Sequence, residues 1–365
     1  MVSRADAPDA APPVPVGRGR RGVPGIHDVA RLAGVSTATV SRALRGVDRV
    51  SAPTRTRVLQ AAADLGYVAS PSAASLASGR TGVVGVIAPF LSRWFFAHAL
   101  DGVEGRLRED GLHVLLFNVG TTRSSRSVLL DQQLLRRRVD AVVVLSCDLE
   151  PEEVAVLQDL HVPVVTLGVD VTPWHRVGID DVAAGRTAMQ HLLSLGHRDI
   201  AYVGGDRVHD VHVATAVDRR AGILQAAEAA GVPAPRELVG DWTLAGGAAA
   251  GELLLDAVPR PTAVIAASDE MAVGVLGVAR RRGLRVPEDL SVVGVDDHEF
   301  AGTHDLTTVA QPVDALGRAA ADLLVDVLQQ GVAVPRRTVV LPTRLVVRGS
   351  TGSLSRTPAS PVRAS

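Results

Sequence analysis

Five side chains between residues 37 and 45 could together read the base edges of DNA: Thr37, Ala38, Ser41, Arg42 and Arg45. Val40 and Leu44 are four residues apart and share one face of a helix, so the five others lie on the face opposite to them. Small polar groups together with arginine suit the DNA major groove, where one guanidinium can pair with both acceptors of a guanine. The pattern predicts a DNA-reading helix, and the alternative is an ordinary helical hairpin with a solvated arginine face.

The residues before this segment are those that a helix-turn-helix needs. Ala30 and Ala33 are small where two helices must pass closely, and Gly34 falls where a tight turn requires a positive φ. Ser36 can cap the second helix, because its hydroxyl can accept a hydrogen bond from the first turn. The segment therefore predicts two helices joined by a tight turn, which positions the second helix for a groove.

The charge of the chain is unevenly distributed, although the formal net charge at pH 7 is −1. Residues 1–80 contain 11 Arg and 5 Asp, a balance of +6, so the remaining 27 Arg and 34 acidic residues give −7. A basic head on an acidic body is typical of a head that meets phosphate. The chain contains no lysine, which excludes mechanisms that need a Schiff-base or phosphate-loop lysine.

The remaining composition indicates a cytoplasmic protein of two or three domains. With 365 residues, of which 47% are hydrophobic, the chain can bury a sizeable core. No stretch of 18 uncharged apolar residues suits a membrane span, and residues 1–22 lack the apolar run of a secretory signal. A single cysteine, Cys147, excludes an intramolecular disulfide framework and is expected to be a buried or half-buried thiol.

From residue 82 onward, apolar runs alternate with amphipathic segments. The predicted strands are Val83–Ala88, His113–Phe117, Ala141–Leu145, Pro163–Leu167, Ile200–Val203, Ala263–Ala267 and Ser291–Val295. The predicted helices are Phe95–Asp110, Ser125–Arg138, Glu152–Leu160, Val182–Leu195, Ala221–Ala230, Ala245–Ala257 and Asp269–Arg282. This alternation favours two lobes, each a parallel sheet covered on both faces, with ligands beyond the carboxyl ends of the strands. We expect the last helix, Ala315–Gln330, and the strand Thr338–Leu341 to return to lobes begun earlier.

The body shows none of the short motifs that mark common catalytic or cofactor sites. There is no GxGxxG after the first strand, no GxSxG and no HExxH. His209 and His212 have poor spacing for one helix face and no evident third metal ligand, so a solvated loop is the preferred interpretation. We therefore expect no catalytic residue, no cofactor and no metal.

Residues 28–44 read DVARLAGVSTATVSRAL, and this run resembles the N-terminal domain of the lactose-repressor (LacI/GalR) family almost position by position. The third helix, Ser51–Tyr67, also matches, and further blocks extend the resemblance over residues 24–349. These blocks are Gly196-His197-Arg198, Asp269–Ala272, Val293–Asp297 and Leu306–Pro312. The resemblance implies a helix-turn-helix domain followed by a core of two lobes like those of a periplasmic binding protein.

The resemblance also implies how the chain is organised. The expected parts are a disordered basic tail at 1–23, a helix-turn-helix domain at 24–69, a hinge helix at 70–81, an effector-binding and dimerisation core at 82–349, and a disordered tail at 350–365. In the family the hinge helix enters the minor groove, and Leu76 occupies the position of the leucine that wedges between base pairs. The last segment contains no leucine heptad, so a dimer is expected and not a tetramer.

Seven residues of the core match effector contacts of the family: Trp94, Phe95, Asp180, Arg219, Trp242, Asp296 and Gln311. An aromatic surface under a sugar ring, with charged groups on its hydroxyls, is a coherent set for a carbohydrate. The alternative for the arginine and the aspartates is a simple ion pair, and for the tryptophan a place in the core. The sequence departs from the family at Arg93-Trp94, Ser268 and Ile223, where Asn-Pro, Asn and an aromatic residue are common, so the ligand need not be a familiar one.

The most coherent interpretation is a DNA-binding transcriptional regulator with an α/β core. It would be a cytoplasmic homodimeric repressor that binds a palindromic operator, without a membrane partner, under the control of a small effector such as a sugar. A solute-binding receptor that shares the core fold is one alternative, against which the basic head and the missing signal peptide argue. An α/β enzyme is the other, and it lacks a recognisable nucleophile, metal site or dinucleotide loop.

Overall fold

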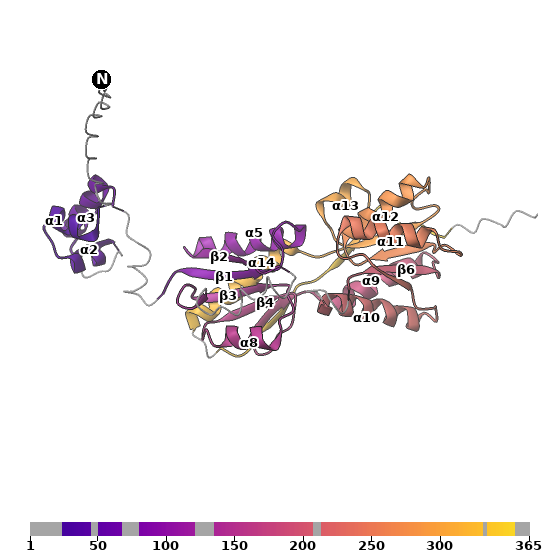
Figure 1. Cartoon of the computed structure of the whole chain (residues 1–365), viewed down its shortest axis with the longest axis horizontal. Coiled ribbons are helices and arrows are strands. Elements are labelled where there is room, and N and C mark those ends of the chain that lie inside the picture. Colours follow the sequence, from indigo (N-terminus) through magenta and orange to yellow (C-terminus); the bar gives the residue numbers. More distant parts are fainter. Residues whose placement is uncertain are drawn as a thin grey trace, which may run out of the picture. The chain divides into compact units, whose positions relative to one another are not determined.

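The computed structural model describes residues 24–44, 50–67, 80–120, 135–206, 213–330 and 334–354. Its internal contacts divide the chain into two units, Met1–Gly79 and Arg80–Ser365, which Figure 1 shows in indigo and in the colours from violet to yellow. The predicted tail at 1–23, most of the predicted hinge helix and most of the predicted helix at 125–138 lie outside the described residues.

The first unit contains three helices, α1 (Ile26–Ala33), α2 (Thr37–Leu44) and α3 (Ala52–Leu65). Helix α1 ends at Gly34, whose φ of 66° is left-handed and whose N–H donates to the carbonyl of Ala30. Ser36 Oγ accepts from the backbone N–H of Thr39 at 3.2 Å, so the predicted cap of α2 is confirmed. The three helices enclose a small core in which Val29, Val40 and Val58 are fully buried. The predicted helix-turn-helix is therefore present.

The first lobe of the second unit is a parallel six-stranded sheet in the order β11-β5-β4-β3-β1-β2. Its strands are β1 (Val83–Ala88), β2 (His113–Asn118), β3 (Ala141–Leu145), β4 (Val164–Leu167), β5 (His175–Gly178) and β11 (Thr338–Val340). Helices α5 (Trp94–Glu109) and α14 (Val313–Gln330) pack on one face, and α8 (Pro151–Gln158) covers the other (Figure 1). A methyl group on Gly317 would lie 2.2 Å from the carbonyl of Ala99, so this glycine allows α5 and α14 to approach closely.

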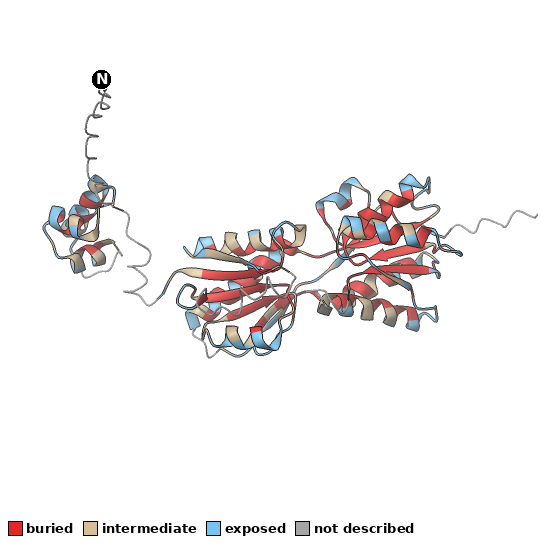
Figure 2. Cartoon of the chain, viewed as in Figure 1, coloured by how far each residue is buried: buried red, intermediate tan, exposed pale blue. Residues whose placement is uncertain are grey.

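The second lobe is a six-stranded sheet in the order β12-β10-β9-β8-β6-β7. Its strands are β6 (Ile200–Gly204), β7 (Arg236–Val239), β8 (Ala263–Ala266), β9 (Ser291–Asp296), β10 (Thr307–Ala310) and β12 (Arg344–Val346). All neighbours are parallel except β12, which runs antiparallel to β10. The helices are α9 (Asp181–Ser194), α10 (Val213–Ala229), α11 (Leu244–Leu255), α12 (Asp269–Arg281) and α13 (Glu299–Thr303). The pairs α9–α10 and α11–α12 lie on opposite sides of the sheet (Figure 1), and the strands between them are buried (Figure 2).

The chain crosses between the lobes three times, at residues 178–181, 310–313 and 340–344. Helix α14 and strand β11 thus return to the first lobe, as the sequence predicted, and β12 returns to the second lobe. The sequence missed β5, β7, β10, β12 and α13. The missed strands are three or four residues long, too short to show a periodic pattern.

The prediction that a disordered tail begins at residue 350 is wrong. Ser350 is 2% exposed, and its hydroxyl donates to the carbonyl of Val292 at 2.6 Å. The backbone N–H of Gly352 donates to Ser291 Oγ at 3.1 Å, and that of Leu354 donates to the carbonyl of Leu195. These polar residues therefore belong to the second lobe, and the predicted tail from 355 onward lies outside the described residues.

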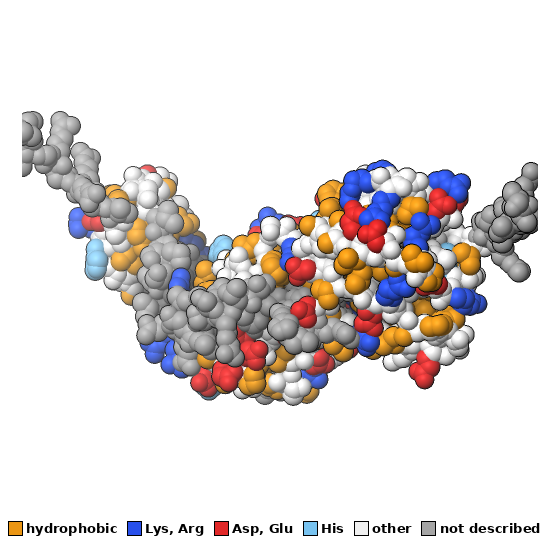
Figure 3. All heavy atoms as spheres, turned by 45° about the vertical axis from the view of Figure 1, so that its right-hand side comes forward, with side chains coloured by type: hydrophobic (Ala, Val, Ile, Leu, Met, Phe, Trp, Pro, Cys, Tyr) orange, Lys and Arg blue, Asp and Glu red, His pale blue; other side chains and the backbone are white. Residues whose placement is uncertain are grey.

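The surface of the second lobe carries both signs of charge. Figure 3 shows arginine and carboxylate side chains interspersed over the visible face of this lobe. Arg282, for example, contacts both Glu252 and Asp256 on α11 and just beyond it. No helix in the described part of the chain is long and apolar enough to cross a membrane.

Candidate functional site

The candidate DNA-reading surface is one face of α2. Ala38 and Arg42 are exposed, and Thr37 and Ser41 are half-buried, while Val40 and Ala43 on the other side are buried in the core of the head. The placement expected from the sequence is therefore present for these four residues. Arg45 and Leu76, the other two predicted DNA contacts, lie outside the described residues. A short helix with small side chains and one exposed arginine has the size and chemistry for a major groove.

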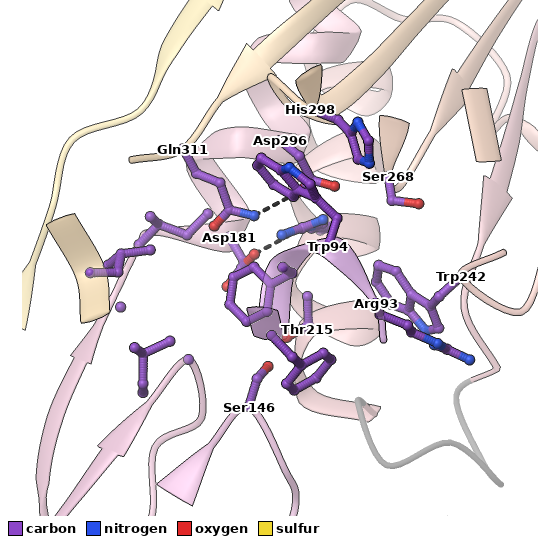
Figure 4. A pocket seen from close by; sticks show the side chains of 18 of the residues that line it. Arg93, Trp94, Ser146, Asp181, Thr215, Trp242, Ser268, Asp296, His298 and Gln311 are labelled. Carbon is purple, nitrogen blue, oxygen red and sulfur yellow. Dashed lines mark hydrogen bonds and ion pairs between the residues drawn. The ribbon is translucent and has the colours of Figure 1, made fainter. Parts of the chain in front are cut away.

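The candidate effector site is a cavity of about 80 Å³ at the carboxyl ends of strands from both lobes (Figure 4). Ser146, Gly168 and Gly178 contribute from the first lobe, and Ser268 and Asp296 from the second. This is the position that the alternation of strands and helices predicted. Six of the seven predicted effector residues line the cavity: Trp94, Phe95, Arg219, Trp242, Asp296 and Gln311.

The seventh, Asp180, does not line the cavity. Its side chain is exposed and caps α9, accepting from the backbone N–H of Ala183 at 2.8 Å. The next residue, Asp181, is buried and lines the cavity instead. An aspartate at an N-cap folds back on its own helix, so the carboxylate of Asp180 is held at the start of α9 and not at the cavity. Ile223 does not line the cavity either, because it is buried on α10 in the core.

Arg219 is held at the site by a buried ion pair. Its Nε lies 2.8 Å from Asp181 Oδ1, its Nη1 donates to the carbonyl of Ala267, and the two side chains are 6% and 8% exposed. Arg219 therefore forms the ion pair with an aspartate that the sequence left open as an alternative, and the aspartate is Asp181. No hydrogen bond among the described residues uses Nη2, so this group keeps its donors for a ligand.

Two buried carboxyl groups lie near each other, Asp296 at the end of β9 and Asp269 at the start of α12. Asp296 Oδ1 accepts from Gln311 Nε2 at 2.6 Å, and burial raises the pKa of Asp296 to about 6 although Arg219 opposes the shift. Asp269 accepts from Thr308 Oγ1 at 2.7 Å and from the backbone N–H of His298 at 2.9 Å. Burial and the charge of Asp296 raise the pKa of Asp269 to about 8. Burial of both groups and the repulsion between their charges therefore favour a proton shared by this pair near neutral pH.

The backbone at two points of the site is strained. Asp296 has a φ of 132° and Asp297 a φ of 62°, and Asp241 and Trp242 have φ values of 51° and 54°. Such conformations are costly for residues other than glycine and cluster at functional sites. Trp242 is 8% exposed and packs against Gly205, where a methyl group would lie 2.2 Å from the indole Nε1. The glycine therefore makes the space that the indole occupies at the edge of the cavity.

Aromatic residues of the first lobe form the opposite wall. The Trp94 ring lies 4.7 Å from that of His98 on the same helix and 4.8 Å from that of His298, which follows β9 in the second lobe. The guanidinium of Arg93 lies 3.7 Å from the centre of the Phe90 ring. Arg93, Trp94 and Ser268, three of the sequence departures, all line the cavity.

Several lining residues were not predicted from the sequence. They are Ser146, Asp181, Thr215, Glu270 and His298. A signal existed for Asp181, which directly follows Asp180, the N-cap residue of α9. The described residues contain no group of three His, Cys, Asp or Glu placed to hold a metal, and His209 and His212 lie outside them.

Comparison with known proteins decides the family. Residues 25–70 match the bacterial regulatory proteins of the lacI family, and residues 189–351 match a periplasmic binding protein-like domain. The HTH-type transcriptional regulator CelR of Thermobifida fusca is 38% identical over 345 residues, which cover 91% of this chain and 99% of CelR. The chain belongs to the LacI family of bacterial regulatory proteins. It is thus a DNA-binding transcriptional regulator, and its relatives are regulators and not enzymes.

Solved structures of the LacI family show the same architecture. The lac repressor dimer bound to operator and the anti-inducer ONPF superposes with a TM-score of 0.81 at 29% identity, covering 91% of this chain and 99% of that one. A CelR–cellobiose complex gives a TM-score of 0.67 at 36% identity, covering 90% and 99%. A LacI family regulator from Enterococcus faecium with bound ribose gives 0.68 at 28% identity, covering 75% and 100%.

Proposed function

We propose that this regulator is a repressor whose operator binding is controlled by a neutral sugar in the cavity between the two lobes. The arrangement of Trp242, Arg219 and Asp296 around one cavity carries the proposal. An indole offers a flat apolar surface to a sugar ring, while a guanidinium and a carboxylate can each bind hydroxyl groups. Cellobiose and ribose in the related structures support the class of ligand.

The charges that line the cavity favour a neutral ligand over an anion. Asp181 already balances Arg219, so the carboxyl groups of Asp296 and Glu270 make the polar side of the cavity acidic. Burial raises the pKa of Glu270, and Arg93 on the first lobe opposes that shift. A phosphate or carboxylate on the ligand would meet these acids, whereas hydroxyl groups can donate to them.

Side chains from both lobes line the cavity, which allows ligand binding to be coupled to operator binding. Trp94 and Phe95 reach the cavity from the first lobe, and Arg219 and Asp296 reach it from the second. A ligand with different affinities for two lobe arrangements shifts their populations, typically with a coupling of about 1–3 kcal/mol. We infer that the protein acts in the cytoplasm as a homodimer on a palindromic operator, with the hinge at 70–81 between the head and the core, as the operator-bound lac repressor dimer supports.

The test uses the full chain and an operator obtained by unbiased selection of DNA duplexes. Neutral sugars and sugar phosphates are compared by calorimetry and by their effect on operator affinity. We expect a neutral sugar to bind and to change operator affinity several-fold, and Asp296→Asn to weaken that response without changing operator affinity in the absence of sugar. Asp241→Asn is the matched control, because this exposed aspartate next to Trp242 does not line the cavity. Binding of sugar phosphates alone would contradict the proposal.

A further inference from the structure

A second cavity of about 480 Å³ adjoins the effector cavity. Trp94 and Gln311 line both of them. The remaining walls of the second cavity include Asp297 after β9, Pro312 and Asp314 at one crossing between the lobes, and Thr343 and Arg344 at another. The structure therefore contains two neighbouring spaces that share a boundary.

Trp94 is the larger part of this boundary and is held from both lobes. Its indole lies between the rings of His98, at 4.7 Å, and His298, at 4.8 Å. Phe300 extends the row of rings, 4.5 Å from His298. Trp94 Nε1 is buried and has no hydrogen-bond partner among the described residues. A buried donor without an acceptor is costly, so its position at two cavities points to an acceptor on a ligand or an ordered water.

The sizes of the two cavities suggest what the boundary does. A cavity of about 150 Å³ in a protein core binds benzene. The effector cavity, at about 80 Å³, is smaller than that, so its volume favours one sugar ring over two.

We propose that Trp94 limits the effector to a single sugar ring by closing off the second cavity. The proposal rests on the proposed function, because it concerns the ligand of the same site. The second cavity has the chemistry for a further ring: Asp297 and Asp314 provide acceptors, Thr343 and Arg344 provide donors, and two prolines provide apolar surface. Without the indole, a two-ring sugar would extend from the effector cavity across the position of Trp94 and contact two of the crossings.

The experiment measures ribose, glucose and cellobiose by calorimetry on the full-length protein and on Trp94→Ala. We expect the unchanged protein to bind a single-ring sugar at least tenfold more tightly than cellobiose, and Trp94→Ala to gain at least tenfold in affinity for cellobiose. Trp94→Leu, which keeps apolar bulk between the two histidines, should give a smaller gain and guards against misfolding of the alanine variant. Adding Thr343→Trp to Trp94→Ala refills the second cavity and should remove the gain. Leu253→Ala is the control, since this exposed side chain of α11 lines neither cavity.

Three results would overturn the proposal. One is equal affinity of the unchanged protein for cellobiose and the single-ring sugars, and another is an unchanged size preference in both Trp94 variants. Either would leave the proposed sugar effector intact, because sugars would still bind. If neither the unchanged protein nor the variants bound any neutral sugar, the proposed effector class would be wrong and the role of Trp94 would be refuted with it.

Discussion

Replacing Arg219 with alanine would leave the carboxylate of Asp181 buried without its ion-pair partner. The two side chains meet at 2.8 Å and are 6% and 8% exposed, so little water can replace the lost guanidinium. Removing one partner of such a buried pair costs roughly 3–5 kcal/mol. The carbonyl of Ala267 also loses the donor on Nη1. Because a domain is stabilised by only about 5–15 kcal/mol, we expect a folded core with markedly lower stability.

Urea unfolding followed by tryptophan fluorescence measures this loss directly. The chain contains three tryptophans, Trp94, Trp174 and Trp242, and all of them belong to the second unit, so the signal reports on the core and not on the head. Replacing both partners with neutral groups of similar size, as in Asp181→Asn with Arg219→Met, should recover most of the stability.

A loss below about 1 kcal/mol in Arg219→Ala would refute this reasoning, because the pair would then contribute no more than an exposed one. A double variant as unstable as Arg219→Ala would also refute it, since the cost would then come from lost packing and not from an unpaired charge. A confirmed loss has a practical consequence. Arg219→Ala is then unsuitable for making a regulator that does not respond to the effector, because the substitution also lowers the stability of the core. Asp296→Asn is the better variant for that purpose.

Three further predictions concern the head, the helix packing and the pH dependence. Arg42→Ala should cost about 1–3 kcal/mol of operator binding and relax selection at one base pair per half-site in a duplex-selection assay, whereas Arg57→Ala on α3 should leave base preference unchanged. Gly222→Ala places a methyl group 1.8 Å from a carbonyl of α9 and should lower the melting temperature, whereas Gly277→Ala meets no close atom and should stabilise the helix by about 0.5–1 kcal/mol. The pKa of Asp269 is about 8 in the folded protein, well above its ordinary value of 3.8, so the folded chain binds more protons than the unfolded chain and its stability falls as pH rises through this range. Between pH 7.5 and 9, where histidines are neutral in both states, urea unfolding should show a loss of roughly 1 kcal/mol that Asp269→Asn reduces.

Long periodic segments and local motifs made much of this structure predictable from the sequence. The turn at Gly34, the cap at Ser36 and the long helices and strands of both lobes follow from local rules that need no knowledge of distant residues. The short strands β7 and β12 were missed because three or four residues with charged side chains carry no pattern, and pairing with neighbouring strands decides their conformation.

The candidate site was predictable where a residue matched a family position and its side chain had no competing local partner. Asp180 failed this condition, because the end of α9 offers a backbone N–H that holds its carboxylate. Glu270 and His298 were missed because their places at the cavity depend on how the lobes are assembled. Nothing in their sequence neighbourhood shows which of several polar residues after a strand points toward the other lobe.

The hydrogen bonds of the site connect the proposed ligand to the crossings between the lobes. Asp181 lies at the first crossing and binds Arg219, and Gln311 lies at the second crossing and binds Asp296. A ligand that accepts hydrogen bonds from Arg219 and donates them to Asp296 therefore competes with, or adds to, the contacts that fix both crossings to the second lobe. Because the angle between the lobes is set by the crossings, the same two side chains can bind the effector and transmit its presence.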